Sequence, residues 1–214
     1  MSTIAAEYVM RISPVIPVLT VPDVAHAAPL ASALVAGGLR VLEVTLRTPD
    51  ALQVVREMAA ACPDAVIGAG TVLNADALKR AVDAGARFIV SPGLTKAVAR
   101  AAEAAGVPLL AGVATATDIM RGLDLGLTRF KFFPAETSGG APAIAAFAGP
   151  FGEVAFCPTG GVTLDNAPRY LGMKNVLCVG GSWICSKDAV EAGDWARITA
   201  LSKGAAALAR AAAG

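Results

Sequence analysis

A repeated pattern of a helical segment, a glycine and an apolar strand most constrains how this chain of 214 residues can fold. Alanine-rich stretches end in glycine just before a short apolar run, at Gly38, Gly85, Gly106 and Gly126. Glycine is common at the end of a helix because it tolerates the left-handed backbone conformation. Helices that alternate with strands predict a parallel sheet with right-handed crossovers.

Eight strands are expected, with starts roughly 20 to 26 residues apart. The expected starts lie near Val15, Leu39, Ala65, Arg87, Val107, Thr128, Glu153 and Asn175. Eight evenly spaced units favour one α/β domain over residues 1–214, a closed (β/α)8 TIM barrel. We also expect an extra helix before the first strand and a helical, alanine-rich tail over residues 188–214. The alternative is an open sheet, but no G-x-G-x-x-G motif follows the first strand, which disfavours a dinucleotide-binding fold.

Composition excludes several classes of partner. The chain is 55% hydrophobic with a net charge of +1, so neither nucleic acid nor a membrane surface is expected to bind it. The four cysteines show no C-x-x-C spacing, and the N-terminus lacks a signal-peptide pattern. Both features predict reduced thiols in a cytoplasmic protein. The single histidine, His26, is expected on the surface of the first helix, so no metal site is predicted.

In such barrels the chemistry lies at the C-terminal ends of the strands. Residues 128–134 (TRFKFFP) read as one of these strands, and alternation places Arg129, Lys131 and Phe133 on the same face. A lysine between aromatic side chains loses hydration, which favours its neutral, nucleophilic form. Lys131 is therefore a candidate Schiff-base nucleophile. The alternative is a structural lysine that extends its charge into solvent.

A second strand, expected over residues 41–48 (VLEVTLRT), points Glu43, Thr45 and Arg47 into the barrel. A buried carboxylate is costly unless it is paired or used chemically. Glu43 is either a general acid/base or one half of an ion pair with Arg47 or Arg129. Arg47 has the planar group that binds a carboxylate through two hydrogen bonds.

Two glycine pairs follow the last two expected strands, in residues 158–162 (PTGGV) and 179–183 (VGGSW). Barrels of this class often hold a phosphate there on backbone N–H groups, although two tight turns would give the same pattern. Lysine, glutamate, arginine and a phosphate cradle at one mouth imply a 2-keto acid with a distal phosphate. No metal or other cofactor is needed, because the iminium is itself the electron sink.

The chain resembles the family of 2-keto-3-deoxy-6-phosphogluconate (KDPG) and 4-hydroxy-2-oxoglutarate (KHG) aldolases, class I enzymes linked to the Entner–Doudoroff pathway. The motifs that carry the resemblance span nearly the whole chain: residues 41–48, 68–74 (GAGTVLN), 91–95 (SPGLT), 130–136 (FKFFPAE), 156–161 (FCPTGG) and 179–183. The resemblance implies a homotrimer that cleaves KDPG to pyruvate and glyceraldehyde 3-phosphate, and also KHG. It implies these roles: Lys131 as Schiff-base lysine, Glu43 as acid/base, Arg47 and Thr71 at the substrate carboxylate, Pro92 and Phe133 lining the pocket, and Thr159, Gly160, Gly161, Gly181 and Ser182 at the hydroxyl and phosphate end.

The first strand departs from the family pattern. Some relatives have an arginine there that reaches the phosphate, whereas this chain has Val15 to Leu19 (VIPVL). Phosphate binding should then depend on the glycine loops. One alternative is an aldolase for the C4-epimeric phosphogalactonate substrate, or one that acts mainly on KHG. Another is a phosphosugar isomerase or synthase that uses the cradle without a covalent step. A non-catalytic binding protein is disfavoured, because the glutamate, lysine and arginine are all present.

Overall fold

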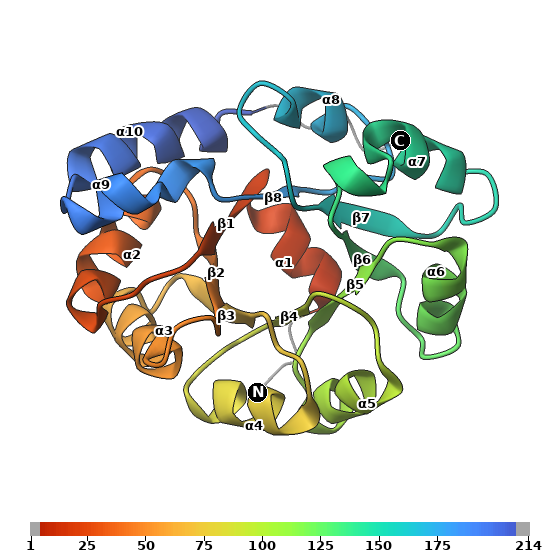
Figure 1. The fold of residues 1–214 in the computed structure, drawn as a ribbon, viewed down its shortest axis with the longest axis horizontal. Coiled ribbons are helices and arrows are strands. Elements are labelled where there is room, and N and C mark those ends of the chain that lie inside the picture. The colour runs from red at the N-terminus through yellow and green to blue at the C-terminus, as the bar shows by residue number, and fades with distance from the viewer. Residues whose placement is uncertain (1–4, 209–214) are drawn as a thin grey trace.

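The computed structural model describes residues 5–208, which form a ring of parallel strands surrounded by helices (Figure 1). The strands are β1 (Val15–Leu19), β2 (Val41–Thr45), β3 (Val66–Gly70), β4 (Ile89–Ser91), β5 (Leu109–Val113), β6 (Arg129–Phe132), β7 (Ala155–Pro158) and β8 (Val179–Gly181). Each begins within four residues of its expected start. Their order is β7-β6-β5-β4-β3-β2-β1-β8. Isolated bridges from Phe156 to Val176 and from Thr159 to Gly180 close the ring between β7 and β8. The predicted (β/α)8 barrel is confirmed.

Helices follow the strands and cover the outside of the ring. They are α2 (Ala27–Ala36), α3 (Ala51–Ala61), α4 (Ala75–Asp83), α5 (Lys96–Ala105), α6 (Ala116–Leu123), α7 (Gly140–Phe147), α8 (Ala167–Leu171), α9 (Lys187–Glu191) and α10 (Trp195–Ala206). Short polar side chains start several of them, because they bond to free N–H groups of the first turn. Thr115 and Asp118 form such a capping box at α6. The helical tail is confirmed as α9 and α10, and residues 209–214 lie outside the described part.

The barrel has two separate apolar cores. The larger one lies between the strands and the outer helices and includes Leu42, Val44 and Phe130. The smaller one fills the inside of the ring, where Val41 and Phe88 lie. Successive side chains of β2 therefore alternate between the two cores, as period-two alternation predicts. This alternation is what turns Glu43 inward.

The predicted extra helix is α1 (Ala6–Ile12), which lies across the centre of the ring in Figure 1. Its Val9 and Met10 are fully buried in the inner core. Its Glu7 accepts hydrogen bonds from Arg129 Nη2 at 2.7 Å and from Arg11 Nε at 2.7 Å. Since Arg129 is the first residue of β6, α1 closes the N-terminal end of the barrel and leaves the other end for chemistry.

Two local expectations were wrong. His26 is not on the surface of the first helix; it ends a 3-10 turn, η1 (Val24–His26), and is half-buried against Trp195 with ring centres 5.6 Å apart. Strand β2 ends at Thr45 rather than at residue 48, so Arg47 lies in the following turn. Strands of closed barrels shorten where the chain must bend outward to reach the next helix, and sequence alternation does not mark that point.

Over residues 5–208, no helix has the length and apolarity needed to cross a bilayer. None of the four cysteines, all within residues 5–208, forms a disulfide, and burial raises the pKa of the Cys185 thiol to about 12.

Candidate active site

A lysine and a glutamate meet inside the barrel. Lys131 projects from β6 and Glu43 from β2, and Lys131 Nζ lies 3.2 Å from Glu43 Oε1. Their side chains are only 6% and 5% exposed. The alternation within β2 and β6 had predicted that both face inward, but the partner expected for Glu43 was Arg47 or Arg129. The partner is Lys131, because Arg129 lies at the opposite end and Arg47 in a turn.

Small residues and one ring shape the space around this pair. A side chain on Gly70 would place its Cβ 2.2 Å from Glu43 Oε1. A side chain on Gly112, which lies beside Lys131 in the sheet, would place its Cβ 2.1 Å from the carbonyl oxygen of Pro92. The Phe133 ring centre lies 5.0 Å from Lys131 Nζ. Pro92 and Phe133 therefore both adjoin this region, and their role in lining a substrate pocket stays a prediction.

Arg47 and Thr71 lie together on neighbouring loops at the mouth. Arg47 Nε donates a hydrogen bond to Thr71 Oγ1 at 3.1 Å, and the Arg47 side chain is exposed. The loops are joined by a hydrogen bond from Leu46 N to Gly70 O of 2.8 Å. Thr71 has a φ of +59°, which is rare for a β-branched residue and costs energy. Such strain is concentrated at functional sites, which agrees with a ligand-binding role for this pair.

The loop after β7 turns its carbonyl groups toward the protein. The carbonyls of Thr159 and Gly160 accept from the N–H groups of Ala135 and Glu136, at 2.8 and 3.1 Å. That of Gly161 accepts from Asn166 Nδ2 at 3.0 Å. Gly160 and Gly161 have φ values of +98° and +76°, which favour glycine. Among residues 5–208 neither of their N–H groups donates to a protein acceptor, so both remain for a ligand.

The loop after β8 lies next to it. A bridge joins Thr159, which follows β7, to Gly180 of β8, and Thr159 is buried. A Cβ on Gly180 would lie 2.2 Å from Thr159 Oγ1, so this glycine allows the close approach. Ser182 is exposed at the start of η3 (Trp183–Cys185). Gly181 has a structural reason to be glycine, because a Cβ there would lie 1.7 Å from the Trp183 ring.

Sequence reasoning missed two residues behind the first loop, Glu136 and Tyr170. Tyr170 is fully buried on α8, and its hydroxyl donates a hydrogen bond to Glu136 Oε1. Glu136 lies within the motif of residues 130–136, but the sequence assigns it no role. No sequence signal links it to Tyr170, since the contact depends on how α8 packs beside the loop after β6.

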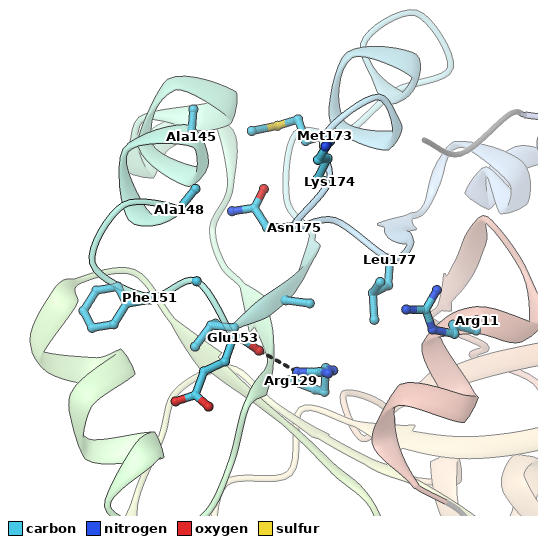
Figure 2. A pocket seen from close by; sticks show the side chains of 13 residues that line it. Arg11, Arg129, Ala145, Ala148, Phe151, Glu153, Met173, Lys174, Asn175 and Leu177 are labelled. Atoms are coloured by element: carbon cyan, nitrogen blue, oxygen red, sulfur yellow. Dashed lines mark hydrogen bonds between the residues drawn. The ribbon is translucent and has the colours of Figure 1, made fainter. Parts of the chain in front are cut away.

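The cavity in Figure 2 lies at the other end of the barrel. It measures about 520 Å³ and is lined by Arg11, Arg129, Lys174 and apolar side chains that include Phe151 and Leu177. Arg129 is already engaged there, with hydrogen bonds to Glu7 and to the carbonyl oxygen of Glu153 at 2.9 Å. In Figure 2 the Glu153 carboxylate points away from Arg129. The candidate catalytic residues do not line this cavity.

The structure thus combines a (β/α)8 barrel, a buried lysine–glutamate pair inside it and a helix across the N-terminal end of its strands, an arrangement that suits the class of lysine-dependent carbon–carbon lyases. The chain belongs to the KDPG and KHG aldolase family, whose model matches residues 6–201. It is 57% identical over 206 residues to a 2-dehydro-3-deoxy-phosphogluconate aldolase of Zymomonas mobilis, covering 95% of this chain and 96% of that one.

Two solved structures of relatives show ligands. A Zymomonas mobilis 2-keto-3-deoxy-6-phosphogluconate aldolase with 3-phosphoglycerate has a TM-score of 0.90 at 56% identity, covering 96% of this chain and 97% of its own. A KDPG aldolase of Legionella pneumophila, with pyruvate captured as a covalent carbinolamine intermediate, has a TM-score of 0.92 at 45% identity, with 94% and 98% covered. No set of three or more histidine, cysteine, aspartate or glutamate side chains is arranged for a metal ion within residues 5–208.

Proposed function

We propose that this protein cleaves 2-dehydro-3-deoxy-6-phosphogluconate to pyruvate and glyceraldehyde 3-phosphate through a Schiff base on Lys131. The observation that carries the proposal is the buried Lys131–Glu43 contact of 3.2 Å. A buried pair can pass one proton between its members without solvent. Carbinolamine formation and dehydration need such transfers.

The reaction balances with these two groups. The Lys131 amine adds to the C2 carbonyl, and loss of water gives the iminium. Glu43 then removes the proton of the C4 hydroxyl, the C3–C4 bond breaks, and its electron pair moves into the iminium to give an enamine. Glyceraldehyde 3-phosphate leaves, the protonated Glu43 gives its proton to C3 of the enamine, and addition of water to the resulting iminium releases pyruvate and the free amine.

The remaining residues bind the two ends of the substrate. Arg47 and Thr71, joined at 3.1 Å, form a site for the C1 carboxylate, to which an arginine can donate two hydrogen bonds. The free N–H groups of Gly160 and Gly161, with Thr159, Gly181 and Ser182 beside them, form the site for the distal hydroxyls and the phosphate. Pro92 and Phe133 line the pocket at Lys131.

Three narrower points belong to the same proposal. KHG, which has no phosphate, is a second substrate, because it presents the same keto acid to Lys131.

We further propose that the protein is a homotrimer in the cytoplasm. Exposed apolar side chains such as Tyr8 and Met120 support the homotrimer, and four cysteines without a disulfide support the cytoplasm. Its mass in solution tests the trimer. The alternative, preference for the phosphogalactonate epimer, is tested by comparing kcat/KM for the two C4 epimers.

The covalent step is tested with borohydride in the presence of pyruvate. Peptide mapping should find a reduced pyruvyl adduct on Lys131, and Lys131→Ala should lose both adduct and turnover. The exposed Lys96 and Lys174 are internal controls in the same digest. No adduct on any lysine would refute the mechanism and favour an isomerase or synthase without a covalent step. An adduct on either control in place of Lys131 would refute the assignment of the Schiff base to Lys131.

A further inference from the structure

The loop proposed to bind phosphate has a carboxylate behind it. Glu136 begins η2 (Glu136–Ser138), and its backbone N–H donates to Gly160 O at 3.1 Å. Its side chain packs against Gly161 so closely that a Cβ on that glycine would lie 2.7 Å from Glu136 Cγ. The Glu136 carboxylate is an acceptor-only group when ionised, and its oxygens lie two bonds beyond Cγ. It is therefore within side-chain reach of the same N–H groups that a phosphate would use.

Tyr170 fixes where this carboxylate points. Its buried hydroxyl donates to Glu136 Oε1. Burial, and then the hydrogen bond to Glu136, raise the pKa of Tyr170 above its usual value, so the phenol remains a donor at physiological pH. Gly140 leaves room for the contact, since a Cβ there would lie 3.3 Å from the Tyr170 hydroxyl. The Arg169 guanidinium lies 6.0 Å from the Tyr170 ring centre and adds positive charge on that side.

We propose that Tyr170 is a positioning residue for phosphate recognition: it holds the Glu136 carboxylate away from the N–H groups of Gly160 and Gly161. This inference rests on the proposed function of that loop. Without the Tyr170 hydroxyl, the carboxylate turns to the loop and occupies its N–H groups. It then competes with the substrate phosphate as an acceptor, and its negative charge repels a phosphate dianion.

The primary test is Tyr170→Phe, which keeps the buried ring and removes only the hydroxyl. We expect KM for KDPG to rise about tenfold, the size of a lost charge-assisted hydrogen bond. Values of kcat and KM for KHG should stay within twofold of wild type, because KHG has no phosphate. The inhibition constant of inorganic phosphate should rise by the same factor as KM for KDPG.

The double variant Tyr170→Phe/Glu136→Met separates competition from simple support of the fold. Methionine keeps the packing against Gly161 but cannot compete as an anion. The double variant should recover at least two thirds of the lost phosphate affinity, on a logarithmic scale. If the loss persists in the double variant, Tyr170 acts by supporting the loop, and the inference is overturned. An unchanged KM in Tyr170→Phe overturns it as well.

Two further variants keep the test decisive. Should Tyr170→Phe not fold, Glu136→Met alone is measured. This variant should bind inorganic phosphate at least as tightly as wild type, and weaker binding refutes the competition between carboxylate and phosphate.

Ser182→Ala tests whether the loops bind the phosphate at all, and it should raise KM for KDPG only. Equal losses on KDPG and KHG in Ser182→Ala overturn the proposed phosphate site and this inference with it. A KDPG-specific loss in Ser182→Ala without one in Tyr170→Phe overturns this inference alone.

Discussion

Replacing Gly70 with alanine should disable the reaction although both Lys131 and Glu43 are kept. The added Cβ would lie 2.2 Å from Glu43 Oε1, 2.7 Å from its Cγ and 2.8 Å from its Cδ. An ordinary contact begins near 3.4 Å, so the carboxyl end must move by about 1 Å. Glu43 is buried among packed neighbours and cannot swing into solvent. The hydrogen bond to Lys131, now 3.2 Å, is therefore broken or badly aligned.

The expected loss follows from the displacement. Misplacing a catalytic group by 1 Å can cost about a hundredfold in rate, and complete loss of a positioned acid/base costs about a hundred- to ten-thousand-fold. We therefore expect kcat for KDPG cleavage to fall by about a hundredfold or more. Overpacking should also lower the free energy of unfolding by about 1–3 kcal/mol, which leaves a folded protein at 25 °C.

Three measurements on Gly70→Ala test this reasoning: kcat, exchange of the pyruvate methyl protons in deuterated water, and thermal unfolding. The control is Gly152→Ala, where the added Cβ has no neighbour within 4 Å and both rates should stay within twofold of wild type. If folded Gly70→Ala exchanges protons at the wild-type rate, Glu43 is not the proton carrier, or its position does not matter.

Two further predictions concern Glu43, inside the barrel, and Glu7, on the helix at its N-terminal end. Glu43→Gln should lower kcat by about a hundred- to ten-thousand-fold and slow pyruvate proton exchange; exchange at the wild-type rate would leave Glu43 only as the ion-pair partner of Lys131. Glu7→Gln should lower the melting temperature at pH 7 by about 2 °C, since partly exposed ion pairs contribute about 1 kcal/mol or less. Hydrogen bonds from Arg11 and then Arg129 lower the pKa of Glu7, so its contribution is present above the unfolded pKa and disappears as pH falls through the folded one. The difference in melting temperature between wild type and Glu7→Gln should therefore shrink in acid, and a constant difference would contradict this account.

Much of the fold was predictable because it depends on short-range pattern. The spacing of glycines and apolar runs predicted eight strands, and period-two alternation predicted that Lys131 and Glu43 point inward. Their contact was not predictable from the strands alone, because it joins β2 to β6 across the interior. Alternation gives the face of a strand, whereas barrel closure decides which inward residues meet.

The errors have similar causes. The turn that carries Arg47 begins where β2 leaves the sheet, and the composition of residues 41–48 does not change at that point. The sequence indicates no metal site or other partner for His26, which led to the expectation of a surface position. Trp195, which covers it, is far away in the sequence. The hydrogen bond between Tyr170 and Glu136 likewise joins α8 to the loop after β6.

Closure of one end of the barrel by α1 imposes an order on the proposed catalytic cycle. Val9 and Met10 of α1 fill the interior at the N-terminal end of the barrel, so substrate and products should pass through the C-terminal end of the strands. After carbon–carbon cleavage the three-carbon aldehyde lies on the outer side, while the pyruvyl fragment is still attached to the lysine. The aldehyde must therefore depart first and pyruvate last. In the synthetic direction pyruvate must bind first, and pyruvate should inhibit cleavage competitively against the six-carbon substrate.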